Sequence, residues 1–247
     1  MYYFETIDGK KVLKSDYIKN AQAFFTTRDI CICDKGLGVN GNEKITQNQK
    51  LIAEYLGIES QNLIFPTQTH SVNVETARAS QKDYPDCDGL ILTEKNLGIF
   101  LNFADCTPVI LYDEKQNIGA ISHAGWRGTA GKIGVKTVEK MIENFGTNPK
   151  DIIALIGPAI GFCCYDVGEE VFEKLSKTVG DFSGLYEIRE GKIFVDLKNI
   201  NKRQLEESGV ERIDVCPYCT VHNNDLFYSY RNENGTTLRH SAVLKLI

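Results

Sequence analysis

The stretch GIFLNFADCTPVILYDEKQNIGAISHAGWRGTAGK, residues 98–132, decides the fold that we expect for this chain. It contains three short apolar runs with the length and composition of β-strands. They cover residues 98–103, 108–112 and 118–122. Pro108 fits the start of a strand, because proline cannot donate a hydrogen bond to a sheet. The stretch therefore predicts three successive strands joined by short turns.

Outward from this stretch, apolar runs at 151–157 and 226–230 predict two further strands. Four segments have the apolar periodicity and end signals of helices. We expect them from Thr46 to Gly57, from Lys132 to Phe145, from Asp166 onward with Glu169 in a capping box, and from Asp196 to Gly209. Strands and helices alternate only in part. We therefore expect an α+β fold, a mixed β-sheet core flanked by helices, in a single compact domain over residues 1–247.

The composition is ordinary for a globular protein, with 42% hydrophobic and 25% charged residues. A net charge of −5 gives no basis for sequence-independent binding to nucleic acid or anionic lipid, so a phosphate-bearing substrate requires a local basic patch. Residues 1–17 carry charges where a signal peptide has its apolar run. We expect a cytoplasmic protein that binds neither nucleic acid nor membrane, and whose eight cysteines are reduced thiols.

Three residues have the chemistry of a catalytic metal site. His70 ends the segment FPTQTH, Cys106 follows Asp105 in the turn after the first strand, and His123 follows the strand 118–122. Two imidazoles and one thiolate can hold zinc and leave its fourth position open for water or substrate. The spacing is equally compatible with two hydrogen-bonded histidines and a buried thiol.

Two other segments have weaker signals. In HAGWRGTAGK, small residues surround Arg127, whose planar guanidinium suits a phosphate or a base edge, although a solvated arginine on a Gly-rich turn is the alternative. Cys216 and Cys219 form a CPYC motif, with His222 three residues later. A closed zinc site needs a fourth ligand that the sequence does not identify, so we expect plain thiols there.

Seven segments, in order, resemble a known family and cover the chain from about residue 60 to its end. They are TQTHSVNV, CDGLIL, FADCTPVILYD, ISHAGWRGTAG, GPAIGFCCYDVGEEV, VDLKNINKRQLEESGV and FYSYRNENGTTLRHSA. The series resembles the family long labelled laccase-domain or multicopper-polyphenol-oxidase-like proteins, whose members are now described as purine nucleoside phosphorylases. Some bacterial members are described instead as peptidoglycan editing factors.

The resemblance implies a monomer that binds zinc through His70, Cys106 and His123. It implies phosphorolysis of adenosine, inosine or methylthioadenosine to free base and ribose 1-phosphate, together with adenosine deamination. Under this hypothesis Arg28 and Arg127 bind phosphate, and Asp105 orients a ligand or moves a proton. The chain departs from the family after Arg28, where DICICD stands in place of a GGVS loop.

Three other functions stay open from the sequence. Cys106 could act as a hydrolase nucleophile with His123 as its base. The pocket could edit a peptidoglycan precursor. A copper polyphenol oxidase is disfavoured, because a blue-copper site uses a weak axial ligand such as methionine, and the chain has only Met1 and Met141.

Overall fold

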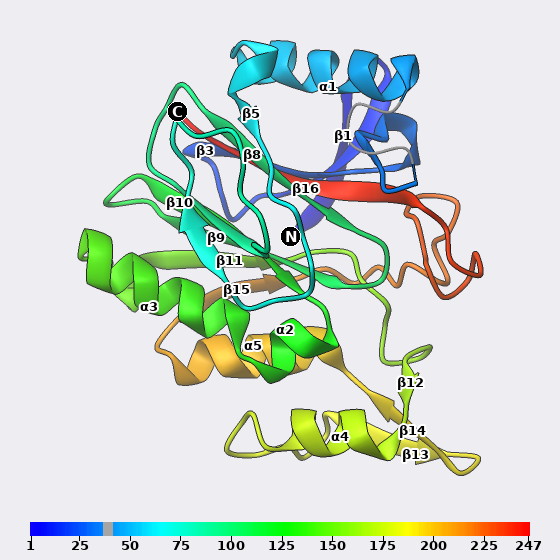
Figure 1. Ribbon diagram of the computed structural model, residues 1–247. Coiled ribbons are helices and arrows are strands. Elements are labelled where there is room, and N and C mark those ends of the chain that lie inside the picture. Colours follow the sequence, from blue (N-terminus) through cyan, green and yellow to red (C-terminus); the bar gives the residue numbers. More distant parts are fainter. Residues whose placement is uncertain (37–41) are drawn as a thin grey trace.

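Two β-sheets packed face to face form the centre of the computed structural model, which describes residues 1–36 and 42–247 (Figure 1). The first sheet has the strand order β1-β2-β3-β16-β8-β5, and β4 also pairs with β16. Its strands are β1 (Tyr2–Ile7), β2 (Lys10–Ser15), β3 (Ala21–Thr26), β4 (Cys33–Asp34), β5 (Leu63–Ile64), β8 (Gly98–Phe103) and β16 (Leu238–Leu246).

The second sheet has the order β15-β11-β9-β10-β7-β6. Its strands are β6 (Val74–Thr76), β7 (Gly89–Leu92), β9 (Thr107–Asp113), β10 (Ile118–Ala124), β11 (Ile152–Ile156) and β15 (Arg212–Val215). Every residue of β7, β9, β10 and β11 is buried, because both faces of this sheet are covered.

The antiparallel pairing of β9 with β10 positions the future site. Its register sets His123 opposite Pro108 and Ala124 opposite Thr107, so the end of one strand meets the start of the other. Cys106, which directly precedes β9, is thereby brought beside His123. The hairpin thus explains why Cys106 and His123 lie close together, which the sequence alone does not show.

Side chains from the two sheets interdigitate to form the main core. Phe25, Leu101 and Leu244 of the first sheet pack in one cluster with Ile110 and Ile121 of the second. The sheets approach closely at Gly119, where a Cβ atom would lie 2.4 Å from the Leu244 side chain. A larger residue at this position would force the two layers apart.

Helices cover the outer faces of both sheets, so the fold has four layers (Figure 1). The helix α1 (Glu43–Leu56) packs on the first sheet, whereas α3 (Ile133–Phe145) and α5 (Leu197–Glu207) pack on the second. The short α2 (Trp126–Ala130) follows β10 directly. A small three-stranded sheet accompanies α4 (Glu169–Ser176) and consists of β12 (Asp166–Val167), β13 (Tyr186–Arg189) and β14 (Lys192–Val195).

The predicted α+β class, with mixed sheets and flanking helices in one compact domain, is confirmed. The four strands predicted between residues 98 and 157 are present, as are the helix from Lys132 to Phe145 and the helix capped by Asp196. In the part of the chain that the structure describes, no helix has the length and apolar character needed to cross a membrane.

Three expectations were wrong. Residues 226–230 form turns rather than a strand, and the C-terminal strand is instead β16. The helix expected from Asp166 begins at Glu169, because Asp166 and Val167 pair with β14. The first helix is capped by Asn42, whose side chain accepts from the backbone N–H of Ile45, so Thr46 lies inside it.

Candidate functional site

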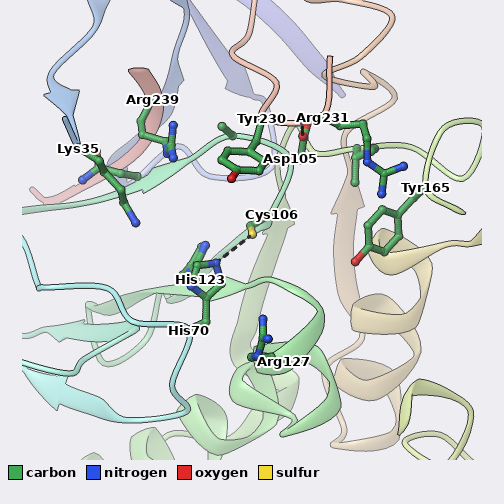
Figure 2. A pocket seen from close by; sticks show the side chains of 13 residues that line it. Lys35, His70, Asp105, Cys106, His123, Arg127, Tyr165, Tyr230, Arg231 and Arg239 are labelled. Atoms are coloured by element: carbon green, nitrogen blue, oxygen red, sulfur yellow. Dashed lines mark hydrogen bonds between the residues drawn. The ribbon is translucent and has the colours of Figure 1, made fainter. Parts of the chain in front are cut away.

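A cavity of about 420 Å³ brings together residues from distant parts of the chain (Figure 2). This volume lies in the range of pockets that hold small organic ligands. Its lining includes His70, Asp105, Cys106, His123 and Arg127. All five residues that we predicted for metal binding and catalysis therefore line a single pocket.

The three predicted metal ligands face one another at the centre of this cavity. Their ligand atoms all lie within 4.8 Å of one another, and Cys106 Sγ lies 3.8 Å from His70 Nε2. In a tetrahedral zinc site with ordinary bond lengths, sulfur and nitrogen ligands are about 3.6 Å apart. The rings of His70 and His123 meet edge to face with centroids 4.8 Å apart. The three residues can therefore hold one metal ion with small adjustments.

Asp88 fixes the orientation of His123 and was missed by the sequence reasoning. Its carboxylate is fully buried and lies 2.7 Å from His123 Nδ1. Because a carboxylate accepts, the Nδ1 atom carries the proton and Nε2 is free to bind a metal. The signal was present in the segment CDGLIL, where an acidic residue directly precedes a buried strand.

The same carboxylate also holds the loop that carries His70. Asp88 accepts hydrogen bonds from the backbone N–H groups of Thr69, His70 and Ser71, at 3.1, 3.1 and 2.7 Å. His70 lies in the left-handed region with φ 66°, a conformation that this ring of hydrogen bonds stabilises. One buried residue thus positions two of the three ligands.

Gly125 provides the space that the ligands need. A Cβ atom at this position would lie 2.8 Å from Cys106 Sγ and 3.2 Å from the ring of His70. Any side chain there would displace one or both ligands. This explains the small residue between His123 and Trp126 in the HAGWRG segment.

The pKa shifts of Cys106 and His123 indicate an ion pair between them in metal-free protein. Burial opposes charge on both groups, but the cationic ring of His123 outweighs it and lowers the pKa of the Cys106 thiol to about 6. In return, the Cys106 thiolate and the Asp88 carboxylate raise the pKa of His123 to about 9. Thiolate is the form of cysteine that both metals and electrophiles require.

Asp105 borders the cavity with its carboxylate already engaged. Oδ1 accepts from the Thr220 hydroxyl at 2.5 Å, and Oδ2 accepts from the backbone N–H of Arg231 at 2.7 Å. Asp105 also lies in the left-handed region, with φ 80°. These bonds hold the turn that presents Cys106, and they join it to the segments that carry Thr220 and Arg231.

Four cationic side chains line the cavity and form a local basic patch (Figure 2). A phosphate-bearing substrate requires such a patch, because the net charge of the chain is negative. Arg127 stacks on the Trp126 ring and makes no ion pair with any residue in the described ranges. Arg231 is paired with Asp166 at 2.5 Å. Arg239 and Lys35 lie near each other on a second side of the cavity. Lys35, Tyr165 and Tyr230 carried no recognisable signal in the sequence.

Arg28 lies apart from the lining of this cavity. Its guanidinium pairs with Glu233 and stacks on Tyr228, with 4.3 Å between the guanidinium carbon and the ring centroid. The predicted phosphate contact of Arg28 would therefore require the Glu233 ion pair to open. Arg127 reaches the pocket without such a cost.

The CPYC motif does not act as a unit in the structure. Cys216 is fully buried in the main core, whereas Cys219 lies beside Cys163, Cys164 and His222. The expectation of a plain thiol suits Cys216, but the missing partners of Cys219 come from a segment more than fifty residues away.

The chain is similar to known proteins in both sequence and fold. A family model described as multi-copper polyphenol oxidoreductase laccase matches residues 32–247. The chain is 32% identical over 241 residues to "Purine nucleoside phosphorylase YlmD" of Bacillus subtilis, covering 90% of this chain and 87% of that protein. It is 31% identical over 247 residues to "Adenosine deaminase RL5" of an unknown prokaryotic organism, covering 91% and 94%. The crystal structure of YlmD from Geobacillus stearothermophilus superposes with a TM-score of 0.88 at 30% identity, covering 95% and 96%.

Replacing Asp88 tests its role in orienting His123. We expect Asp88→Asn to weaken zinc binding about 10- to 100-fold, as is typical when the hydrogen-bond partner of a metal-binding histidine is lost. Competition titration against a chromophoric chelator measures the change. Asp86→Asn is the matched control, since Asp86 bonds to Thr69 and Asn73 in the same loop but not to His123. Equal losses in both variants would contradict the assignment.

The lowered pKa of Cys106 predicts its reactivity in metal-free protein. Because the thiolate forms above a pKa of about 6, alkylation by iodoacetamide should reach half its maximal rate near pH 6 and plateau at higher pH. Peptide mass spectrometry identifies the labelled residue. His123→Gln removes the cation and should move the midpoint to higher pH, and added zinc should protect Cys106. An unchanged midpoint in this variant would disprove the ion pair.

Proposed function

Since the chain belongs to the multi-copper polyphenol oxidoreductase laccase family, we propose that residues 1–247 form one zinc-dependent domain that cleaves purine nucleosides with phosphate and also deaminates adenosine. One observation carries the proposal. The His70, Cys106 and His123 set lies in the same cavity as the unpaired cation of Arg127. A metal site and an anion site are thus adjacent, as the reaction of a nucleoside with phosphate requires.

The donor set supports zinc as the metal. Two imidazoles and one thiolate are borderline-soft ligands, and three protein ligands leave one position open, as in catalytic zinc sites. Asp88 supplies the carboxylate partner that zinc-binding histidines usually have. Neither methionine lines the cavity, and Met141 belongs to α3 and is buried in the core. Methionine therefore does not supply the axial ligand of a blue-copper site.

Phosphate would bind beside the metal ligands through the basic patch. Arg127 offers a planar fork that matches phosphate oxygens, and Lys35 and Arg239 add positive charge from the opposite side (Figure 2). Arg231 is less available, because Asp166 already holds its guanidinium. We therefore assign the first phosphate contact to Arg127 and keep Arg28 as the second candidate, conditional on release from Glu233.

Cleavage of the glycosidic bond develops positive charge on the ribose and negative charge on the leaving purine. When bound, zinc supplies Lewis acidity, which stabilises negative charge on a reacting group. The residues of the chain supply orientation: Arg127 holds the nucleophilic phosphate, and Tyr165 and Tyr230 offer aromatic surfaces in the cavity for the base. Preorganised charges of this kind act without reorganisation during the reaction.

Asp105 is assigned a positioning role in this proposal. Both of its carboxylate oxygens already accept hydrogen bonds from the protein, so it holds Cys106 and the Arg231 segment in place. Each oxygen keeps a second lone-pair site, so these two bonds do not block a proton transfer. The positioning role rests on the bonds themselves, which join the turn of Cys106 to the segments of Thr220 and Arg231.

A metal-free cysteine hydrolase is the second candidate, and a specific observation favours it. Cys106, His123 and Asp88 are arranged in space like the nucleophile, base and orienting carboxylate of a catalytic triad. Under this alternative the Cys106 thiolate attacks an acyl carbon, and zinc inhibits the reaction. The response to chelation therefore separates the two functions.

The product assay tests the proposal directly. Inosine or adenosine with phosphate should yield free base and ribose 1-phosphate, and adenosine without phosphate should yield inosine. Liquid chromatography with mass spectrometry distinguishes these products. Chelator treatment should abolish both reactions, and zinc should restore them. Nucleoside cleavage that survives chelation would contradict the role of zinc, and acyl hydrolysis that appears only after chelation would favour the hydrolase. Absence of base release at full zinc occupancy would favour a peptidoglycan-editing role.

Replacing the two arginines separates their roles. We expect Arg127→Lys to raise the KM for phosphate roughly tenfold or more, because a bidentate charge-assisted hydrogen bond is lost. The KM for nucleoside and the phosphate-independent deamination should change less. Arg28→Lys is the matched control, and we expect only a small effect, since Arg28 pairs with Glu233. The reverse pattern would transfer the phosphate contact to Arg28.

A further inference from the structure

Four soft ligands outside the cavity converge from two separate segments. Cys163 and Cys164 lie between β11 and β12, and Cys219 and His222 lie after β15. One ligand atom from each of the four lies within 4.8 Å of the other three. Among the described residues, only this group and the cavity triad bring three or more potential metal ligands so close together.

Three distances within this group are close to the edges of a zinc-centred tetrahedron, although the two to His222 involve different nitrogens of its ring. Sulfur–nitrogen and sulfur–sulfur edges in such a site measure about 3.6 and 3.8 Å. Here Cys163 Sγ lies 3.6 Å from Cys164 Sγ, and the ring nitrogens of His222 lie 3.5 Å from Cys163 Sγ and 3.4 Å from Cys164 Sγ. A disulfide bond would require about 2.05 Å between sulfur atoms, so Cys163 and Cys164 are free thiols at a separation that a shared metal ion would allow.

The backbone holds the two segments together independently of any ligand. Ala159 and Cys219 form a parallel β-bridge, and the N–H of Gly161 donates to Cys219 Sγ at 3.2 Å. A Cβ atom on Gly161 would lie only 3.0 Å from Cys219 Cβ and 3.1 Å from Cys163 Sγ. The two segments are therefore closely packed at Gly161, where a side chain would not fit without movement of its neighbours. The fold thus sets Cys163 and Cys219 close together, whereas the side chain of His222 is exposed.

We propose that Cys163, Cys164, Cys219 and His222 form a second zinc site, closed by four protein ligands and structural in function. Three thiolates and one imidazole are an established structural donor set for zinc. Only one nitrogen of His222 binds, so its exposed ring turns slightly as the ion enters. Three thiolates and Zn²⁺ leave one net negative charge. Two guanidinium groups lie beside it, since Arg189 donates to the Phe162 carbonyl and Arg231 to the Cys164 carbonyl.

The position of this second site gives it a consequence for the cavity. Tyr165, which follows Cys164, lines the cavity, and Thr220, which follows Cys219, donates to Asp105. Zinc at the second site would therefore fix two parts of the cavity wall relative to each other. Because zinc binds only the folded arrangement of the four residues, its binding also adds to the stability of the fold.

Metal counting on the intact protein tests the proposal. Wild-type protein purified under reducing conditions should contain two zinc ions per chain by plasma mass spectrometry. His123→Gln should remove the ion of the cavity, and Cys163→Ser combined with His222→Gln should remove the other. Cys216→Ser is the matched control, since Cys216 belongs to the same CPYC motif but is buried outside the cluster, and it should retain both ions.

Two further measurements keep the test independent of the cavity and of its activity. In His123→Gln protein, cobalt should replace the remaining zinc and give strong thiolate-to-metal absorption, which Cys163→Ser with His222→Gln should abolish. Chelation should lower the Tm of His123→Gln protein but not that of the triple variant. Full metal content after loss of Cys163 and His222 would overturn the proposal. So would a disulfide among the three cysteines in freshly purified protein, or a zinc count that falls to zero in His123→Gln alone.

Discussion

The buried carboxylate of Asp88 is the interaction on which the candidate site depends. A carboxylate with no exposed surface is costly unless it is fully paired, and Asp88 achieves this through His123, the Ser71 hydroxyl and three backbone N–H groups. Although burial alone would raise the pKa of Asp88, these partners keep it well below its usual range. The hydrogen bonds that stabilise the charge of Asp88 thus also align two of the candidate metal ligands, His70 and His123.

The sheet architecture determines where this charge can lie. Asp88 directly precedes β7, and β7 pairs with β10, so the carboxylate lies beside the end of the strand that carries His123. The backbone N–H of His123 also donates to the Asp88 carbonyl at 2.8 Å. Candidate ligands from the loop before β6, from the turn before β9 and from β10 therefore converge, because β9, β10, β7 and β6 are consecutive strands of the second sheet.

The sequence predicted those parts of the molecule that depend on local chemistry. The apolar runs between residues 98 and 157 form buried strands because both of their faces are covered. The residue types of His70, Cys106 and His123 left two interpretations open, and the family resemblance singled them out as candidate ligands. The N-terminal strands were missed because their charged and apolar residues do not alternate clearly. The strand β16 was missed because it follows a long turn region. The phosphate contact of Arg28 was predicted from the family resemblance, but its ion pair with Glu233 depends on a contact across 205 residues, which the sequence does not reveal.

The cavity residues and the second ligand group are connected through Asp105, which both segments of the second group contact. The segment after β11 donates to the Asp105 carbonyl through Ile160, carries Cys163 and Cys164, and reaches the cavity at Tyr165. The segment after β15 contributes Cys219 and then Thr220, which binds the Asp105 carboxylate. Asp105 therefore receives hydrogen bonds from both segments while it presents Cys106. Asp105 has a left-handed backbone conformation, which the surrounding structure must stabilise. The segments after β11 and after β15, which meet at the second ligand group, provide this stabilisation.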